Sequence, residues 1–339
     1  MTELPAGRPT VYDVARVAGV SIKTVSRVVN QSAGVSDKTR QLVLGVVEEL
    51  GYVVNPAARS LVTGSSSTIG VIVDSIADPF FASLVSVVEV RALAAGFSTQ
   101  VASTWRDPQR ERDQLLRMTR ENVSGLMLAP TMGDHSWFAA TVGDVPAVLV
   151  DRGWPGSGLD MVGVNDRAGA KHAVEQLLKA GHTRIAFLGD DTELTTTEHR
   201  REGYLAAMDA AGVPVPEELD RGSLAMTDPG VGAVTELLEL PDPPTALFSS
   251  NARASLGAVR ALHMTGRTDV ALISFGDFEL ADALQPGITV VDHDPALIAA
   301  TAVERLLARI GGAQLVPAEI LLPTPLVKRG SGEVPCNRS

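Results

Sequence analysis

The stretch VYDVARVAGVSIKTVSRVVN, residues 11–30, has the pattern of two short helices joined by a tight turn. Two helices that cross steeply need a small residue at their contact, a glycine in the turn and apolar residues toward the shared core. Counted from Val11, Ala15 is the fifth residue and Gly19 the ninth, as this geometry requires. The core positions carry Val14, Ala18, Val20, Val25 and Val28. The spacing predicts a helix-turn-helix, and an ordinary helical hairpin is the alternative for this window alone.

In such a motif the N-terminal end of the second helix enters the major groove of DNA. Lys23 suits an acceptor-rich base edge and Ile22 a thymine methyl group, whereas Thr24, Ser26 and Asn30 suit phosphate contacts. For each residue the alternative is a solvated helix face. The residues of this window for which we predict DNA contacts are Val11, Tyr12, Ser21, Ile22, Lys23, Thr24, Ser26, Arg27 and Asn30.

The pattern continues C-terminally with a third helix, which Ser36 can cap and which ends before Gly51. Residues 55–61 are a short helical candidate with proline in the first turn, and residues 64–67 read as a flexible linker. From Thr68 onward, short apolar runs alternate with amphipathic stretches. The expected strands are 69–73, 98–102, 125–128, 147–150, 184–188, 246–248, 270–273 and 288–291. The expected helices between them include 81–95, 109–121, 168–180, 199–211 and 254–263.

This alternation predicts doubly wound parallel sheets, and two series of it predict two α/β lobes. We expect a small all-α head at 1–54 and a hinge and linker at 55–67. An N-lobe would comprise 68–165 with 295–323, and a C-lobe 166–294 with 324–330. The polar residues 331–339 read as a disordered tail.

Composition narrows the class of protein. The chain has 339 residues, 45% of them hydrophobic and 20% charged, with no apolar run of membrane-spanning length. The first ten residues lack the apolar core of a signal peptide, so we expect a cytoplasmic protein. The lone Cys336 excludes a disulfide framework and a cysteine-based metal cluster. The net charge is −11, but residues 1–60 carry seven Lys or Arg against five acids, a weakly basic head on an acidic body.

Several motifs together resemble the lactose-repressor (LacI/GalR) family. They include Val11-Tyr12-Asp13-Val14-Ala15, Thr24-Val25-Ser26-Arg27-Val28-Val29-Asn30, Leu50-Gly51-Tyr52 and Asn55-Pro56-Ala57-Ala58-Arg59-Ser60-Leu61. The likeness extends to Leu326-Val327-Lys328-Arg329 and so covers nearly the whole chain. It implies a two-lobed sensor like that of periplasmic binding proteins, and a homodimer that binds a pseudo-palindromic operator, usually as a repressor. A small-molecule effector in the cleft between the lobes would change operator affinity.

The resemblance also assigns roles to the hinge. In the family this segment is helical on DNA, and paired hinges enter the minor groove. Leu61 matches the leucine that wedges between base pairs, and Ala58 the small residue beside it, while Asn55 and Arg59 belong to the same contact segment. An apolar wedge unstacks a base step and kinks the duplex.

Ligands of open parallel sheets bind beyond the carboxyl ends of the strands. Asp74, Asp78 and Phe80 follow the first expected strand, and Asp151 and Arg152 follow the fourth. Asp74 and Asp151 have helix capping as an alternative. By resemblance, Asp151 binds effector, Arg200 grips it, and Asn251 and His293 face it. The predicted effector contacts are Asp78, Phe80, Asp151, Thr196, Arg200, Asn251, Arg253, Asp277 and His293.

Two departures from the family pattern bear on the effector. The family commonly has Asn-Asp where this chain has Asn251-Ala252-Arg253, and two aspartates where it has Gly276-Asp277. Fewer acids and an added arginine predict a more positive cleft. A carbohydrate-type effector with a carboxylate or phosphate, such as a sugar acid or sugar phosphate, would suit it.

Two other classes of protein are alternatives to a DNA-binding regulator. A two-lobed ligand-binding protein without DNA function shares the sensor fold, but it would carry no helix-turn-helix. An enzyme would need a nucleophile–base pair, a metal-ligand cluster or a phosphate-binding glycine loop, and the sequence shows none of these. We therefore predict no catalytic residues, no cofactor or metal and no membrane contact.

Overall fold

The structure consists of two units, and the first of them is a small group of helices. The chain divides into two units, Met1–Ser67 and Thr68–Ser339, which we call the head and the sensor. The computed structural model describes residues 9–29, 33–52, 66–190, 193–222 and 230–336. The described head holds helices α1 (Val11–Ala18), α2 (Ile22–Val29) and α3 (Asp37–Leu50).

These helices follow the predicted pattern. The Ser21 Oγ accepts a hydrogen bond from the Thr24 N–H at 3.1 Å, and the Ser36 Oγ accepts one from the Thr39 N–H at 3.3 Å. Gly19 ends α1 with φ +65°, a left-handed conformation that favours glycine. One face of each helix meets the others in a small core of Val14, Ala15, Ala18, Val25, Val28, Val43 and Val46. The predicted helix-turn-helix is confirmed.

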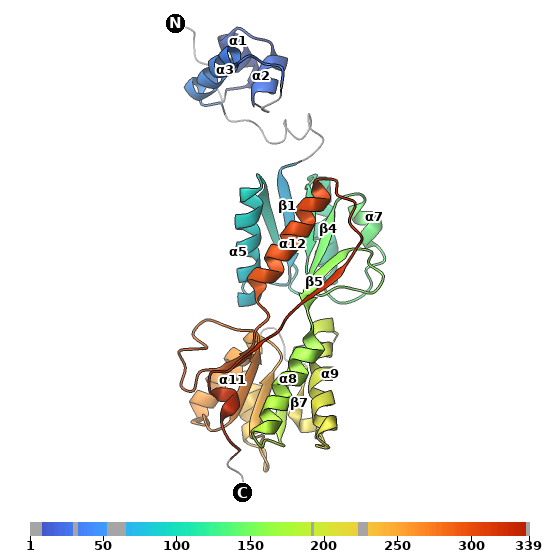
Figure 1. Cartoon of the computed structure of the whole chain (residues 1–339), viewed down its shortest axis with the longest axis vertical. Helices are drawn as coiled ribbons and strands as arrows, with labels where there is room; N and C mark the ends of the chain where they lie inside the picture. Colours follow the sequence, from blue (N-terminus) through green and yellow to red (C-terminus); the bar gives the residue numbers. More distant parts are fainter. Residues whose placement is uncertain (1–8, 30–32, 53–65, 191–192, 223–229, 337–339) are drawn as a thin grey trace. The chain divides into compact units, whose positions relative to one another are not determined.

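The first lobe of the sensor, here the N-lobe, is built on a six-stranded parallel sheet (Figure 1). Its spatial order is β11-β5-β4-β3-β1-β2. The strands are β1 (Thr68–Val73), β2 (Ser98–Ser103), β3 (Gly125–Leu128), β4 (Ala147–Asp151), β5 (Asp160–Val164) and β11 (Glu319–Leu322). The helices are α5 (Pro79–Ala94), α6 (Pro108–Arg120), α7 (Phe138–Val142) and α12 (Pro295–Ile310). Helix α12 packs beside α5 and over β3, β4 and β5.

The second lobe, the C-lobe, carries a six-stranded sheet of order β12-β10-β9-β8-β6-β7. Only the β10–β12 pair in it is antiparallel. The strands are β6 (Ile185–Leu188), β7 (Asp220–Arg221), β8 (Ala246–Ser249), β9 (Ala271–Phe275), β10 (Thr289–Val291) and β12 (Leu326–Val327). The helices are α8 (Asp166–Lys179), α9 (Thr195–Ala210), α10 (Val231–Leu238) and α11 (Ala252–Thr265), with the short 3₁₀ helices η1 (Glu217–Leu219) and η2 (Ser331–Glu333).

The chain crosses between the two lobes after β5, between β10 and α12, and between β11 and β12. Strands β1, β3 and β4 are almost fully buried and apolar, as expected where helices cover both faces of a parallel sheet. The carboxyl ends of the parallel strands of both sheets face the junction of the lobes, where Arg106, after β2, contacts Asp190, after β6. The predicted fold class, an all-α head with a two-lobed α/β sensor, is confirmed.

The prediction of a disordered tail from residue 331 is wrong for residues 331–336. The Ser331 Oγ donates to the Leu272 carbonyl at 2.5 Å and accepts from the Thr289 N–H at 2.8 Å. Glu333 accepts a hydrogen bond from the Thr289 Oγ1 at 2.8 Å. The polar composition that indicated disorder instead satisfies polar groups of β9 and β10. Residues 337–339 lie outside the described part of the chain.

Candidate functional site

The outer face of α2 is the first candidate site. Val25 and Val28 of α2 are buried in the head core, whereas Ile22, Lys23 and Arg27 are exposed on the remaining helix surface. The exposed fraction of Ile22 is 42%, high for an isoleucine that has a core within reach. An apolar side chain and two cations thus lie on one surface of the helix, the combination that base edges and phosphates bind.

The other predicted DNA contacts of the head differ in exposure. Tyr12 on α1 and Ser21 before α2 are exposed, and Thr24 and Ser26 are half-buried. The Ser21 and Thr24 hydroxyls lie 2.9 Å apart and share a hydrogen bond, so both also take part in capping α2. Val11 is half-buried and packs against the head core, which favours a structural role for it. Asn30, Asn55, Ala58, Arg59 and Leu61 lie outside the described residues.

In the sensor, Arg152 is the centre of a polar cluster at the carboxyl ends of the N-lobe strands. Its Nη2 donates to Asp74 Oδ1 at 2.5 Å and its Nη1 to Asp151 Oδ2 at 2.6 Å. Its Nε donates to the Pro130 carbonyl at 2.6 Å. Arg152 is only 6% exposed, and its two carboxylate partners balance a charge that burial would otherwise disfavour. Asp74 and Asp151 therefore bind an arginine, and the capping alternative for them is wrong.

The loop that carries Pro130 is itself held by a buried carboxylate. Glu111 of α6 accepts hydrogen bonds from the Thr131 N–H at 2.5 Å and lies 2.8 Å from His135 Nε2. The His135 ring stacks on Trp154 with 4.3 Å between the ring centres. These contacts fix the position of the Pro130 carbonyl, which accepts a hydrogen bond from Arg152.

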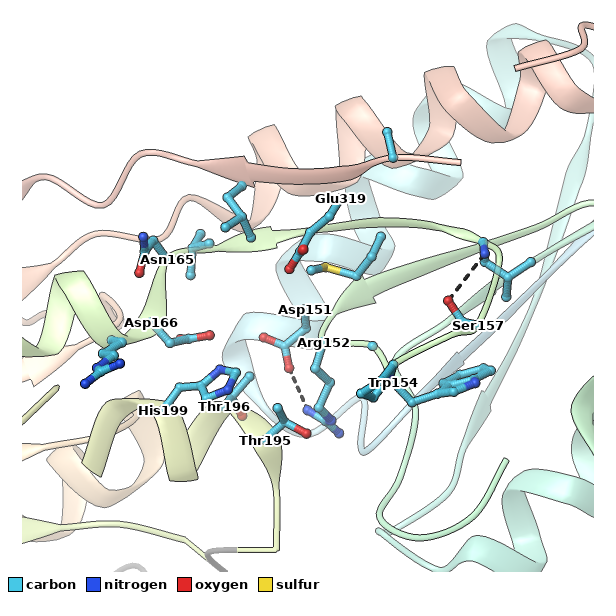
Figure 2. A pocket seen from close by; sticks show the side chains of 18 of the residues that line it. Asp151, Arg152, Trp154, Ser157, Asn165, Asp166, Thr195, Thr196, His199 and Glu319 are labelled. Carbon is cyan, nitrogen blue, oxygen red and sulfur yellow. Dashed lines mark hydrogen bonds and ion pairs between the residues drawn. The ribbon is translucent and has the colours of Figure 1, made fainter. Parts of the chain in front are cut away.

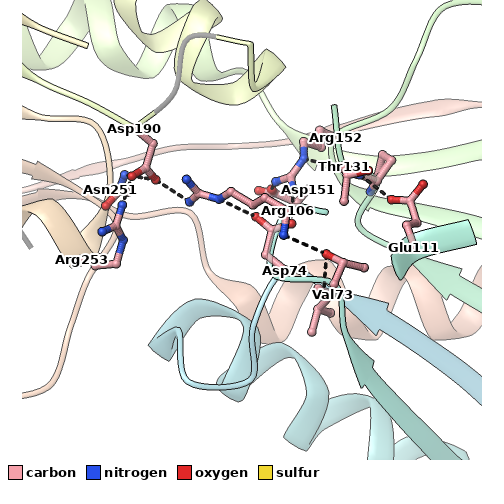
Figure 3. A network of polar contacts seen from close by, with 12 residues as sticks. Val73, Asp74, Arg106, Glu111, Thr131, Asp151, Arg152, Asp190, Asn251 and Arg253 are labelled. Carbon is pink, nitrogen blue, oxygen red and sulfur yellow. Dashed lines mark hydrogen bonds and ion pairs between the residues drawn. The ribbon is translucent and has the colours of Figure 1, made fainter. Parts of the chain in front are cut away.

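Asp190, at the end of β6, collects donors from both lobes (Figure 3). From the C-lobe, Asn251 Nδ2 donates to Asp190 Oδ2 at 2.8 Å, and Arg253 forms an ion pair with Asp190 Oδ1. From the N-lobe, Arg106 Nη2 donates to Asp190 Oδ2 at 2.7 Å. Burial, together with the nearby charge of Arg106, lowers the pKa of Arg253. The two arginines are thus close enough to repel one another, and Asp190 compensates both.

Arg200 of α9 forms a second C-lobe cluster. Its Nε donates to Asp166 Oδ1 at 2.6 Å, its Nη1 donates to the Ser250 carbonyl at 2.7 Å, and its guanidinium lies 3.9 Å from the centre of the Phe275 ring. Burial raises the pKa of Asp166 to about 6, although Arg200 opposes this shift. Asp166 therefore titrates just below neutral pH.

His293, after β10, lies flat against Phe80 of the N-lobe, with 4.5 Å between the ring centres. It is 7% exposed, and burial and then Arg200 lower its pKa to about 3. Its Nδ1 is buried without a hydrogen-bond partner among the residues that the structure describes, as is the Ser250 Oγ. A neutral imidazole with an unused nitrogen can exchange a hydrogen bond with a ligand hydroxyl.

A cavity of about 710 Å³ opens beside these clusters (Figure 2). Asp151 and Arg152 line it from the N-lobe, and Asp166, Thr196 and His199 from the C-lobe. Trp154 and Met161 add apolar surface. Carboxylates and hydroxyls beside an aromatic ring form the kind of lining that binds small polar ligands with apolar faces.

Comparisons with known proteins identify the two units. Residues 10–55 match the family described as bacterial regulatory proteins, lacI family, and residues 174–332 match the periplasmic binding protein-like domain. The HTH-type transcriptional regulator DegA of Bacillus subtilis is 31% identical over 331 residues, covering 96% of this chain and 98% of DegA. The chain belongs to the LacI/GalR family.

Other members of the LacI/GalR family agree. The ribose operon repressor of Escherichia coli is 31% identical and covers 95% of this chain and 99% of its own. The crystal structure of the Lac repressor dimer bound to operator and the anti-inducer ONPF superposes with a TM-score of 0.85. It is 30% identical and covers 96% of this chain and 99% of its own. This LacI/GalR-family chain is therefore a DNA-binding transcriptional regulator, and its relatives are regulators rather than enzymes.

The structure brings together most, but not all, of the predicted effector residues. Asp151 and Thr196 line the cavity, Asn251 and Arg253 meet at Asp190, and Phe80 stacks on His293. Arg200 binds the cavity-lining Asp166. Asp78 caps α5 by accepting from the Phe80 N–H at 2.9 Å, and burial raises its pKa.

Asp277 is the exception among the predicted residues. Its two carboxylate oxygens accept hydrogen bonds from the Arg329 guanidinium at 2.7 and 2.5 Å, and its side chain is 41% exposed. This pairing leaves Asp277 apart from the cavity and from the clusters around Arg152, Asp190 and Arg200.

Asp74 and Arg152 were noted at strand ends but not predicted to contact the effector, and three further residues of the clusters were not singled out at all: Arg106, Asp166 and Asp190. Asp190 lies two residues beyond β6 and Asp166 two beyond β5, so the rule that ligands bind at strand ends could have found both. Arg106 carries no such signal. Its place depends on a turn after β2 in which Trp105 and Arg106 have φ +57° and +62°.

The predicted positive cleft stays a prediction, but carboxylates balance several of its arginines. Four arginines at the lobe junction each pair with at least one aspartate: Arg106, Arg152, Arg200 and Arg253 with Asp74, Asp151, Asp166 and Asp190. The sequence argument counted the added Arg253 but not Asp190, which binds it.

Metal sites and membrane-spanning helices are two further features that a chain of this length can carry. In the described ranges, no three His, Cys, Asp or Glu side chains are grouped so that they could hold a metal ion. Across the same ranges, no helix is both long and apolar enough to cross a membrane.

Proposed function

We propose that this regulator is a repressor that binds a pseudo-palindromic operator as a homodimer and responds to a small carbohydrate effector in the interlobe cleft. The observation that carries the DNA-binding part is the exposed face of α2. Ile22, Lys23 and Arg27 lie on this face, and the head core is packed against the opposite face of the helix. The segment of Asn55, Ala58, Arg59 and Leu61 would add the minor-groove contact that the family resemblance implies. Operator DNA would place the protein in the cytoplasm.

A homodimer is supported by an exposed apolar face on the N-lobe. Val90 and Leu93 of α5 are 66% and 72% exposed, and Val101 lies on β2, the edge strand of the sheet. Helix α5 and β2 are in contact, so both elements belong to the same flank of the N-lobe. Monomeric proteins rarely leave such large apolar side chains together in water. A second copy of the chain is the partner that a symmetric operator requires.

A neutral polyhydroxyl effector suits the cleft better than an anion. Because the cleft arginines already bind aspartates, an anion would have to displace a carboxylate from a buried guanidinium. Sugar hydroxyls can instead donate to carboxylates such as Asp151 and accept from His293 or Arg200 without changing the charge balance. The ribose operon repressor among the relatives is consistent with a carbohydrate.

The test begins with selection of genomic fragments bound by the purified protein, followed by a gel shift on the recovered fragment. Lys23→Ala should weaken binding by about 1–3 kcal/mol, the worth of a base contact. Lys179→Ala removes the same charge from the exposed surface of α8 and should bind like the parent chain. An equal loss of DNA binding in both variants would contradict the proposal, and so would a selection that enriches no fragment. The second outcome would favour a two-lobed ligand-binding protein without DNA function.

The effector is tested by calorimetry with D-ribose, D-gluconate and ribose 5-phosphate. The charge balance predicts that any heat of binding comes from the neutral sugar. Binding of only the two anions would restore the sugar-acid or sugar-phosphate alternative.

A further inference from the structure

Arg106 joins two aspartates that belong to different lobes. Its Nη2 lies 2.7 Å from Asp190 Oδ2 in the C-lobe, and its Nε lies 3.4 Å from Asp74 Oδ2 in the N-lobe. Its side chain is 12% exposed, and those of Asp74 and Asp190 are 5% and 6% exposed. Figure 3 shows the guanidinium between the two carboxylates. An ion pair shielded from water in this way is screened little by salt.

Arg106 lies in an energetically unfavourable turn, and hydrogen bonds hold the backbone on both sides of this turn. Trp105 and Arg106 have φ +57° and +62°, a conformation that disfavours residues other than glycine. The Trp105 N–H donates to the Asp74 carbonyl at 2.7 Å, and the Arg106 N–H donates to the Thr104 Oγ1 at 3.3 Å. Asp107 then caps α6. Two consecutive non-glycine residues in this region indicate that the direction of Arg106 has a use.

Each partner would keep a counter-charge if the lobes moved apart. Asp190 would retain Asn251 and Arg253, both on the C-lobe. Arg106 would retain Asp74, on its own lobe. Removing one member of a buried pair is costly when it leaves a lone charge, but opening the cleft here leaves none. The contact can therefore form and break as the lobes close and open.

We propose that the Arg106–Asp190 ion pair is an interlobe latch that favours the closed sensor in the absence of ligand. It rests on the proposed effector function, because it would set how readily the cleft opens to admit a sugar. Arg106 acts here as a positioning residue, since it acts through the arrangement of the lobes. An effector would favour opening or closure only by the difference in its affinity for the two states.

The latch is tested by the distance between the lobes in protein without ligand or DNA. Spin labels on Asp144→Cys, in the exposed loop before β4, and Asp209→Cys, at the exposed end of α9, report that distance in a Cys336→Ser background. Both sites lie away from the cleft, because β4 reaches it with its carboxyl end and α9 with its N-terminal residues. Double electron–electron resonance then gives the closed and open populations.

Arg106→Gln should lower the closed-to-open ratio about fivefold, the effect of roughly 1 kcal/mol. Asp190→Asn should shift it in the same direction and provides a second variant if the first does not fold. Arg110→Gln is the matched control, because Arg110 also belongs to the N-lobe and lies four residues from Arg106, but its side chain is 59% exposed and pairs with Asp107 of the same lobe.

Unchanged distances in both latch variants would overturn the proposal, as would an equal shift in Arg110→Gln. The measurement uses neither operator nor effector. A failed latch would therefore leave the proposed regulator function standing, and a failed gel shift would leave the latch standing.

Discussion

Asp160 shows at the scale of a single residue how this protein compensates a buried charge. It has no solvent exposure, and its carboxylate accepts hydrogen bonds from Arg305 and Arg309 of α12, each at 2.6 Å, and from the Ala318 N–H at 2.9 Å. Burial alone would raise its pKa, but these hydrogen bonds, Arg309 foremost, outweigh burial and lower the pKa to about 2. The ion pairs tie α12 to β5 and to the approach to β11.

Asp160→Asn should therefore destabilise the sensor in a pH-dependent way. A carboxyl with a lowered pKa in the folded state contributes stability above its ordinary pKa, and that contribution is lost as pH falls toward 2. At pH 7 we expect a loss of about 1–2 kcal/mol in the free energy of unfolding, allowing for two partly exposed arginines.

Urea unfolding at a series of pH values between 7 and 3 measures this difference. The gap between parent and variant should narrow below pH 4. Asp209→Asn, at an exposed position of α9, should unfold like the parent throughout. A gap that stays constant with pH would mean that the Asp160 charge is not the source of the stability.

At the scale of the element, α8 and α9 pack closely because Gly203 lies at their contact. A Cβ added at Gly203 would lie 2.3 Å from the Arg167 carbonyl oxygen and 2.8 Å from Ala170 Cβ. Both neighbours belong to α8, and backbone cannot move aside as a flexible side chain can. The helices carry Arg200 and Asp166, so their separation also sets the geometry of the cleft.

Gly203→Ala should lower the free energy of unfolding of the sensor by about 1–3 kcal/mol, the usual cost of overpacking. Gly45→Ala in α3 is the opposite case, because nothing lies within 4 Å of the added Cβ. There the better helix propensity of alanine should stabilise the head by about 0.5–1 kcal/mol.

Differential scanning calorimetry separates the two effects when head and sensor melt in distinct transitions. When the two transitions overlap, the same comparison is made on the isolated head and the isolated sensor. If Gly203→Ala melted like the parent, α8 and α9 would have to be less tightly packed than the structure shows.

Prediction from sequence succeeded best for elements with a strong local pattern. All eight strands and five sensor helices expected from apolar periodicity are present, within a few residues at each end. The missed elements include β7 and β12, of two residues each, which are too short to show a period. Strand β11 was also not predicted; it has only four residues, lies on a sheet edge and alternates between exposed and half-buried positions.

At the scale of the whole molecule, the proposed dimer interface on α5 and β2 can be tested by a single substitution. Leu93→Asp places a charge where the proposed interface would exclude water, and it should convert a dimer into a monomer. Operator affinity should fall with it, because a single head contacts only half of a symmetric site.

Sedimentation equilibrium measures the assembly state directly. Val316→Asp is the control, since Val316 is also exposed and apolar but lies outside α5 and β2. A parent chain that sediments as a monomer at micromolar concentration would contradict the homodimer, and a dimer that tolerates Leu93→Asp would place the interface elsewhere.

The sequence by itself determined the helix-turn-helix, the two-lobed α/β plan and most residues at the strand ends. These depend on local spacing: glycine at the turn, apolar residues at the helical period, and polar residues after buried strands. Only the tertiary structure decided which charges meet. Arg253 adds a positive charge in the sequence, but in the structure Asp190 lies beside it and balances that charge. Arg106 reaches the cleft through a left-handed turn that spacing does not encode. The helix-turn-helix was predictable because its contacts join residues near in sequence. The charge of the cleft was not, because, apart from the neighbours Asp151 and Arg152, its ion pairs join residues 32 to 84 positions apart.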